Sequence, residues 1–320
     1  MFTLHLGDAL SHLRTLPAES IQCCVTSPPY FGLRDYGHEG QVGLEPTPHD
    51  YVASLIEVFE EVRRVLKKDG VCFLNLGDSY VSSPRGNKPG DHSTASLTNP
   101  KRQDTVPREK GKKKDFSGLK PKDLIGIPWR TAFALQSAGW YLRQDIIWAK
   151  PNPMPESVTD RCTKAHEYLF LLTKSAKYYY DHEAVKEPCS EDMQRRAAKG
   201  HTRGPGGKVD ASRQDGDTLR GEHAKKIDTS KGRNKRSVWT VTTKSYKGCH
   251  FATFPPDLIR PCILAGTKPG DTVLDPFAGS GTTGQVALEH DRNAILIELN
   301  PDYEPLIRQR CAPQVNGFKI

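Results

Sequence analysis

The segment Asp275-Pro276-Phe277-Ala278-Gly279-Ser280-Gly281-Thr282-Thr283-Gly284 decides the fold, because it joins a predicted strand to a predicted helix. The strand is the apolar run 272–274, and the helix covers residues 281–289. The three glycines of the segment fit the spacing G-x-G-x-x-G, which lets the backbone turn tightly and approach a ligand without an intervening Cβ. The segment therefore predicts a ligand-binding turn at the end of a strand.

A carboxylate follows at the end of the next predicted strand, where Glu298 can accept hydrogen bonds from ribose hydroxyls. Three interpretations compete: a dinucleotide bound through its pyrophosphate, S-adenosylmethionine, and a tight turn with no ligand. Asp275 favours the second, because a carboxylate that faces the ligand suits a cationic methionine amine and repels a pyrophosphate. The cofactor residues expected on this basis are Asp275, Pro276, Gly279, Ser280, Gly281, Thr282 and Glu298.

The rest of the chain alternates between strand and helix patterns around this segment. Predicted strands cover residues 2–6, 20–26, 71–76, 141–150, 167–173 and 294–298, and predicted helices cover 51–68, 124–138, 255–265 and 302–310. This alternation predicts an α/β fold with a mainly parallel sheet and helices on both faces. The successive strands 141–150 and 167–173 can pair antiparallel, which adds a hairpin at the edge of the sheet.

A second motif, Thr26-Ser27-Pro28-Pro29-Tyr30, ends the predicted strand 20–26. An exocyclic amino group of a base is a poor nucleophile, because its lone pair is delocalised into the ring. Acceptors that bind its N–H groups can hold the lone pair toward a methyl donor. Ser27 offers a hydroxyl, and Pro28 and Pro29 have no N–H, so that their backbone can only accept.

Tyr30 completes this motif with a flat face on which an extruded base can stack, worth about 1–3 kcal/mol. The alternative is a Pro-Pro turn that ends a strand, with Tyr30 as packing. That alternative explains the motif alone, but the glycine segment favours the catalytic interpretation with Ser27, Pro28, Pro29 and Tyr30 as the catalytic residues.

The positive charge of the chain is concentrated in two polar segments. The net charge is +8; residues 84–122 hold 11 basic and 4 acidic residues, and residues 186–236 hold 14 basic and 8 acidic residues. Such segments bury too little apolar surface to fold alone, so solvated linkers are one interpretation. Their charge favours the other interpretation, contact with phosphates. The expected DNA-binding residues are Lys112, Lys113, Lys114, Arg203, Arg233, Lys235 and Arg236.

Deleting residues 110–114 tests the phosphate interpretation. The deletion is expected to weaken DNA binding and to flatten its salt dependence, because fewer counterions are released on binding. The measurement is the DNA dissociation constant at several salt concentrations. An unchanged salt slope would contradict the phosphate contacts.

Together, the two motifs resemble the amino-directed DNA methyltransferases of the circularly permuted β class, in which the catalytic loop precedes the cofactor loop. The resemblance covers most of the chain outside the two basic segments. It implies a Rossmann-like S-adenosylmethionine-dependent fold and site-specific methylation of a flipped base in double-stranded DNA. The Ser-Pro-Pro-Tyr form around Ser27 implies N4 of cytosine, whereas an Asp or Asn in that place goes with N6 of adenine, with exceptions in both directions.

Further residues take roles only through this resemblance. Asp8 would contact the cofactor adenine, Phe251 and Pro255 would line its methionine end, and Phe277 would lie beside the adenosyl group. Segments 148–152 and 161–173 would border and close the base pocket. No metal is implied, because departure of a neutral thioether needs no Lewis acid.

The expected organisation is one catalytic domain interrupted twice. Residues 1–83 form the half with the catalytic loop, 84–122 a basic flexible insertion, 123–185 the rest of that half, 186–237 a target-recognition region and 238–320 the cofactor-binding half. We expect a cytoplasmic monomer or homodimer; the sequence leaves open whether it acts in restriction–modification beside a cognate restriction endonuclease or stands alone. No apolar stretch is long enough to span a bilayer.

Two other classes of protein remain open as alternatives to a DNA methyltransferase. RNA or protein amine methyltransferases share a Pro-Pro-Tyr loop, but the permuted motif order and the basic segments favour DNA. A non-catalytic nucleic-acid-binding module explains the charge, but it does not explain the pair Asp275 and Glu298.

Overall fold

The computed structural model describes two compact units, which are treated separately below. It describes residues 1–81 apart from 34, 36 and 39, then 116, 118–198, 229–230, 232–243 and 254–312, and the backbone of 202–203, 225–226, 314–315 and 318–319. The first unit comprises residues 1–180 and 237–320, and the second comprises residues 181–236.

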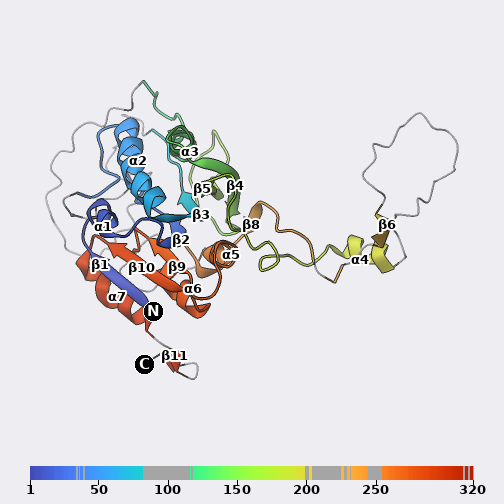
Figure 1. Cartoon of the computed structure of the whole chain (residues 1–320). Helices are drawn as coiled ribbons and strands as arrows, with labels where there is room; N and C mark the ends of the chain where they lie inside the picture. The colour runs from blue at the N-terminus through green and yellow to red at the C-terminus, as the bar shows by residue number, and fades with distance from the viewer. Residues whose placement is uncertain are drawn as a thin grey trace. The chain divides into compact units, whose positions relative to one another are not determined.

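An eight-stranded sheet with the order β1-β10-β9-β2-β3-β5-β4-β8 forms the centre of the first unit (Figure 1). Its strands are β1 (Phe2–Leu6), β2 (Ile21–Thr26), β3 (Leu66–Leu76), β4 (Tyr141–Ala149), β5 (His166–Thr173), β8 (Val238–Thr240), β9 (Thr272–Asp275) and β10 (Asn293–Glu298). All pairings are parallel except those of β5 with β3 and β4. The predicted hairpin therefore exists, but the short strand β8 lies outside it and forms the edge.

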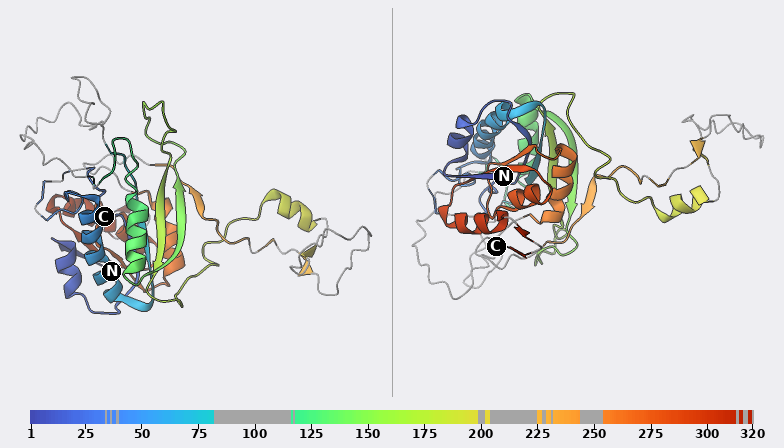
Figure 2. Two further views of the ribbon diagram at one scale, coloured as in Figure 1. Left: turned by 90° about the horizontal axis from the view of Figure 1, so that it is seen from above. Right: turned by 60° about the horizontal axis from the view of Figure 1, so that its bottom comes forward.

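Six helices cover the two faces of this sheet, as Figures 1 and 2 show. One face carries α1 (Ala9–Thr15), α2 (Pro48–Val65) and α3 (Ile127–Ser137), and the other carries α5 (Pro256–Gly266), α6 (Thr282–Glu289) and α7 (Glu304–Cys311). Neighbouring residues of one strand enter different cores: Cys24 packs with the α1–α3 side and Cys23 with the α5–α7 side. This alternation follows from the two-residue period of a strand, and it confirms the predicted α/β fold.

Several element boundaries differ from the predicted ones. Helix α3 begins at Ile127 rather than at residue 124, because Gly126 adopts a left-handed conformation with φ 77° and Pro128 follows in the first turn. Helix α2 ends at Val65, three residues before the predicted end, and β3 begins directly after it. Helix α1 was not predicted; Asp8 caps it by accepting from the Ser11 N–H at 2.7 Å.

The second unit contains α4 (Glu191–Ala198), β6 (Thr202–Arg203) and β7 (Lys225–Lys226), with β6 and β7 paired antiparallel. Glu187 and Arg233 form a backbone bridge within it. The chain also has the 3-10 turn η1 (Pro301–Tyr303) and the terminal hairpin β11 (Gln314–Val315) and β12 (Phe318–Lys319). Among the described helices, none is long and apolar enough to cross a membrane.

Candidate functional site

The two motifs meet at one edge of the sheet, because β2 and β9 are neighbouring parallel strands. Thr26 ends β2 and Asp275 ends β9, and the Thr26 hydroxyl donates to Asp275 Oδ1 at 2.6 Å. In an open α/β sheet, the loops after the carboxyl ends of the strands form the ligand crevice. The catalytic motif and the glycine segment therefore border one space, although 249 positions separate Thr26 from Asp275.

Asp275 is only 1% exposed and is held by groups of the chain itself. Its Oδ1 also accepts from the Phe277 N–H at 3.1 Å, and its Oδ2 accepts from the Thr283 hydroxyl at 2.6 Å. Burial raises the pKa of this carboxyl to about 6, although the three hydrogen bonds lower it. The expected geometry, with Asp275 facing a ligand, is not met, because its oxygens satisfy donors inside the protein.

The glycine segment forms the turn that its spacing predicts. Gly279 and Gly281 have φ of 53° and 80°, in the left-handed region that favours glycine. A Cβ on Gly281 would also lie 3.2 Å from the Ile307 Cα of helix α7. The segment therefore needs glycine both for its turn and for the close packing of α7.

Glu298 lies at the end of β10 and is 9% exposed. Its Oε2 accepts from the Gly279 N–H at 2.7 Å, and its Oε1 accepts from the Asn300 N–H at 2.9 Å. Burial raises the pKa of the Glu298 carboxyl to about 7, with the nearby Asp275 charge acting in the same direction. This carboxylate is thus oriented by two backbone amides while it still borders open space.

That open space is a cavity that opens to solvent and is bordered by both motifs. Its walls come from the carboxyl ends of four parallel strands, β1, β10, β9 and β2. The predicted residues in its lining are Asp8, Ser27, Pro28, Pro29, Tyr30, Pro276, Phe277, Gly279, Ser280, Thr282 and Glu298. Asp275, Gly281 and Pro255 lie outside that lining, and Phe251 lies outside the described residues.

Residues without a predicted role complete the described lining. They are Gly7, Ala9, Leu33, His38, Gly40, Gln41, Val42, Val58, Phe254, Ala278, Leu299, Asn300 and Tyr303. Two signals could have found part of this set. Gly7 and Leu299 directly follow strands that end at the site, and Phe254 precedes the predicted Pro255.

The two proline carbonyls of the catalytic motif differ in their environment. The Tyr51 hydroxyl of helix α2 donates to the Pro29 carbonyl at 2.8 Å. No group in the described part of the chain donates to the Pro28 carbonyl, and the Ser27 hydroxyl makes only a 3.5 Å contact with the Tyr30 hydroxyl. Ser27 and Pro28 therefore keep the acceptor capacity that the motif predicts, while Pro29 anchors the loop.

Tyr30 lines both this cavity and a second hollow, most of whose lining follows β3 and β4 or begins β5. Charged and titratable side chains make up more than half of the residues that line the second hollow. They include Asp78, Lys150, Glu156, Lys164, His166 and Glu167. This hollow lies along the segments expected to border a base pocket, 148–152 and 161–173. Asn75 and Glu167, which were not predicted, contact the Tyr30 hydroxyl, and the isolated polar Asn75 at the end of an apolar strand was the available signal.

Replacing Gly77 with alanine tests how tightly the Tyr30 ring is packed. A Cβ there would lie 2.5 Å from Tyr30 Cε2, so the ring or the strand end must move. We expect the free energy of unfolding to fall by about 1–3 kcal/mol, as for other overpacked sites. Urea denaturation measures this, with Gly77→Ala repeated in a Tyr30→Ala background as the control. An equal loss in that background would show that the ring is not the obstacle.

The predicted DNA-binding residues fall into two groups. Lys112, Lys113 and Lys114 lie outside the described residues, as does the side chain of Arg203. In the second unit, Arg233 and Lys235 lie 3.4 and 3.5 Å from the Glu187 carboxylate, and Arg236 is exposed. Their contact with phosphates stays a prediction.

A family model described as DNA methylase, N6_N4_Mtase, matches residues 21–309. Three curated relatives are the Type II methyltransferases M.Cfr9I of Citrobacter freundii, M.XycI of Xanthomonas campestris pv. cyanopsidis and M.SmaI of Serratia marcescens. They are 50%, 48% and 46% identical over 94%, 98% and 95% of this chain. The alignments cover 84%, 88% and 89% of the relatives.

Solved structures share the fold at lower identity. The PvuII DNA methyltransferase, described as cytosine-N4-specific, has a TM-score of 0.62 and 20% identity, covering 99% of this chain and 88% of that one. A DNA modification methylase of Thermus thermophilus, TTHA0409, solved with S-adenosyl-L-methionine, has a TM-score of 0.57 and 23% identity, covering 100% and 98%. These likenesses support the Rossmann-like architecture.

Proposed function

Because this chain belongs to the DNA methylase family whose name joins the N6 and N4 amino positions, we propose that it methylates N4 of cytosine in double-stranded DNA. One observation carries the proposal: the free acceptors of Ser27 and Pro28 line the same cavity as Glu298 and the glycine segment. Acceptors for an amine and a site for a methyl donor thus border one space.

The residues of the cavity fit S-adenosylmethionine as the methyl donor. Glu298 presents a buried, backbone-oriented carboxylate beside the glycine turn, where it can accept from ribose hydroxyls. Asp8 and Phe277 lie in the same lining, in agreement with roles at the adenine and the adenosyl group. When bound, the cofactor supplies an electrophilic methyl group on a sulfonium, which leaves as a thioether after transfer.

The chain's own part in the reaction is to orient the amine. Ser27 Oγ and the Pro28 carbonyl would each accept one N–H, which directs the nitrogen lone pair toward the methyl donor. The methylated amine would have one proton to lose, and that proton can pass to solvent. Tyr30, at the border of the two hollows, would stack on the extruded base.

Ser27 supports cytosine over adenine, because the Ser-Pro-Pro-Tyr form goes most often with N4 of cytosine in the family that the motifs resemble. Mass spectrometry of nucleosides from DNA of cells that express the protein tests this choice. N4-methylcytosine is the expected product, and a Tyr30→Ala strain is the matched control. N6-methyladenine would instead show that the enzyme is adenine-directed, and neither product would contradict the proposed activity.

The names of the relatives also support a partner. M.Cfr9I, M.XycI and M.SmaI are all named Type II methyltransferases, and we extend the restriction–modification setting to this chain with a cognate endonuclease that shares its site. Long-read sequencing of DNA from expressing cells would give that site together with the modified base.

Cofactor affinity should depend on pH through Glu298. Its pKa of about 7 means that the carboxyl is protonated below that pH, and protonation removes a negative charge beside a cationic ligand. We expect the affinity for S-adenosylmethionine to fall by up to about tenfold per pH unit below 7. Calorimetry between pH 6 and pH 8 measures this, and Glu298→Gln should bind weakly with a flat profile. A Gln variant with the wild-type pH profile would contradict the role of Glu298.

A further inference from the structure

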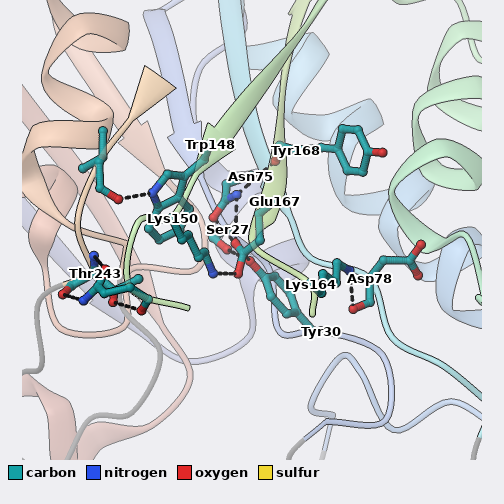
Figure 3. A network of polar contacts seen from close by, with 12 residues as sticks. Ser27, Tyr30, Asn75, Asp78, Trp148, Lys150, Lys164, Glu167, Tyr168 and Thr243 are labelled. Carbon is teal, nitrogen blue, oxygen red and sulfur yellow. Dashed lines mark hydrogen bonds and ion pairs between the residues drawn. The ribbon is translucent and has the colours of Figure 1, made fainter. Parts of the chain in front are cut away.

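The hydroxyl group of Tyr30 is fixed at the end of a polar network, which Figure 3 shows. It donates to Glu167 Oε2 at 2.7 Å, and Asn75 Oδ1 lies 3.3 Å from the same hydroxyl oxygen. Stacking of a base needs only the face of an aromatic ring, and a phenylalanine would offer it equally well. Base stacking therefore does not account for the hydroxyl group of Tyr30 or for its hydrogen bond to Glu167.

Glu167 is itself held by two other side chains. Lys150 Nζ forms an ion pair with its Oε1, and Asn75 Nδ2 donates to its Oε2 at 3.2 Å. Asn75 Nδ2 also donates to the Tyr168 carbonyl at 3.0 Å. Only 18% of the Lys150 side chain and 14% of the Glu167 side chain are exposed, so that water competes little with these contacts.

The antiparallel strand of the sheet creates this arrangement. Strand β5 pairs with β3 on one side and β4 on the other, which places Glu167 beside Trp148 and two residues from Leu169, the partner of Asn75. Side chains from β3 and β5 thus meet at one hydroxyl, and Lys150 binds the far oxygen of Glu167. Lys150 follows β4 directly, and its ammonium also lies 4.3 Å from the centre of the Trp148 ring.

The contacts of both Glu167 oxygens indicate whether this carboxylate takes a proton from a substrate or orients a neighbouring side chain. Oε1 binds an ammonium and Oε2 accepts from Tyr30 and Asn75, so this carboxylate is already engaged on both sides. A group engaged in this way is poorly placed to take a proton from a substrate, but it is well suited to orient a neighbour.

We propose that Glu167, held by Lys150 and Asn75, is a positioning residue that sets the Tyr30 ring at the angle required for stacking the target base. The proposal rests on the proposed function, since it assigns a task to the base side of the same site. Gly77 supports it, because a Cβ at this position would collide with the Tyr30 ring in its present orientation.

A double-mutant cycle of Tyr30→Phe and Glu167→Gln tests the proposal. Each single change should lower kcat by about 10- to 100-fold, the range expected for a hydrogen bond to a charged group. The double variant should be no slower than the slower single one, because Glu167 acts through the hydroxyl that Tyr30→Phe has already removed. The measurement is single-turnover transfer of labelled methyl from S-adenosylmethionine to amplified, unmethylated genomic DNA.

The controls separate positioning from loss of structure. Glu304→Gln removes a similar carboxylate from a surface ion pair with Arg308 and should leave kcat unchanged. Calorimetry with S-adenosylmethionine should show wild-type affinity for all variants of the cycle, which reports that the cofactor half is folded.

Three results would overturn the proposal. Glu167→Gln could leave kcat unchanged, it could slow the Tyr30→Phe enzyme as much as it slows the wild type, or it could abolish cofactor binding. Wild-type protein that binds S-adenosylmethionine but transfers no methyl group to DNA would instead contradict the proposed function, the premise of this inference. The two failures are therefore distinguishable.

Discussion

Tyr30→Ala is expected to lower kcat for DNA methylation by about 100-fold while leaving the affinity for S-adenosylmethionine within about twofold of wild type. Loss of base stacking accounts for about 1–3 kcal/mol, and each 1.36 kcal/mol is a factor of ten in rate. The change also removes the donor at 2.7 Å from Glu167 Oε2, which leaves that partly buried carboxylate with fewer partners. Single-turnover methylation and calorimetry measure the two quantities separately.

A matched control for Tyr30→Ala is Tyr141→Ala. Tyr141 begins strand β4 and is 47% exposed, so its removal takes an aromatic ring from the surface and should leave kcat unchanged. Tyr30→Phe should lie between wild type and Tyr30→Ala, since it keeps the ring face. A Tyr30→Ala enzyme that has lost its cofactor affinity would contradict the role given to Tyr30.

Asp275→Ala is expected to destabilise the protein and to abolish cofactor binding, although Asp275 does not line the cavity. Removal of the carboxylate leaves the Thr26 hydroxyl, the Thr283 hydroxyl and the Phe277 N–H without their acceptor. Buried unsatisfied donors cost about 1–3 kcal/mol each, so we expect a loss of about 2–5 kcal/mol in the free energy of unfolding. Urea denaturation measures this loss, and calorimetry measures the affinity.

Asp275→Asn is the informative counterpart of that variant. An amide at position 275 can keep the acceptor for Thr26 and Phe277 and can donate to Thr283, whose hydroxyl then turns to the Val25 carbonyl, already 3.3 Å away. We therefore expect Asp275→Asn to keep its fold and its cofactor affinity. Wild-type stability and affinity in Asp275→Ala would refute the structural role of this carboxylate.

The pH dependence of stability should also distinguish Asp275→Asn from the wild-type protein. The pKa of Asp275 is about 6 in the folded protein, above its ordinary value of 3.8. Between pH 3.8 and pH 6, the folded protein therefore keeps a proton on Asp275 that the unfolded chain has lost. The stability that this proton confers is present below pH 3.8 and is lost as the pH rises through 6. Asp275→Asn does not titrate, so its stability relative to wild type should rise across that window and stay level above it.

The sequence by itself determined most of the fold. The glycine spacing between a strand and a helix, and the alternation of apolar strands with amphipathic helices, predicted the parallel sheet and its two covered faces. These patterns are local, because they depend on residues within one or two turns of each other. Element ends were less predictable: the start of α3 depends on the left-handed Gly126, and α1 depends on the Asp8 cap.

The sequence also predicted part of the cavity lining. Eleven of the residues expected from the two motifs and the family resemblance belong to the described lining. The family of the chain rests on the DNA methylase model, which matches residues 21–309.

The tertiary structure alone decided which groups individual side chains contact. Asp275 turns into the protein because β2 lies beside β9, which brings Thr26 within 2.6 Å of its carboxylate. Glu167 reaches Tyr30 because β5 runs antiparallel to β3 and β4. These partners lie 249 and 137 positions apart, so no local pattern encodes their contacts. The order of the strands in the sheet brings these partners together. Because the contacts are then largely shielded from water, each hydrogen bond contributes more to stability than it would at the surface.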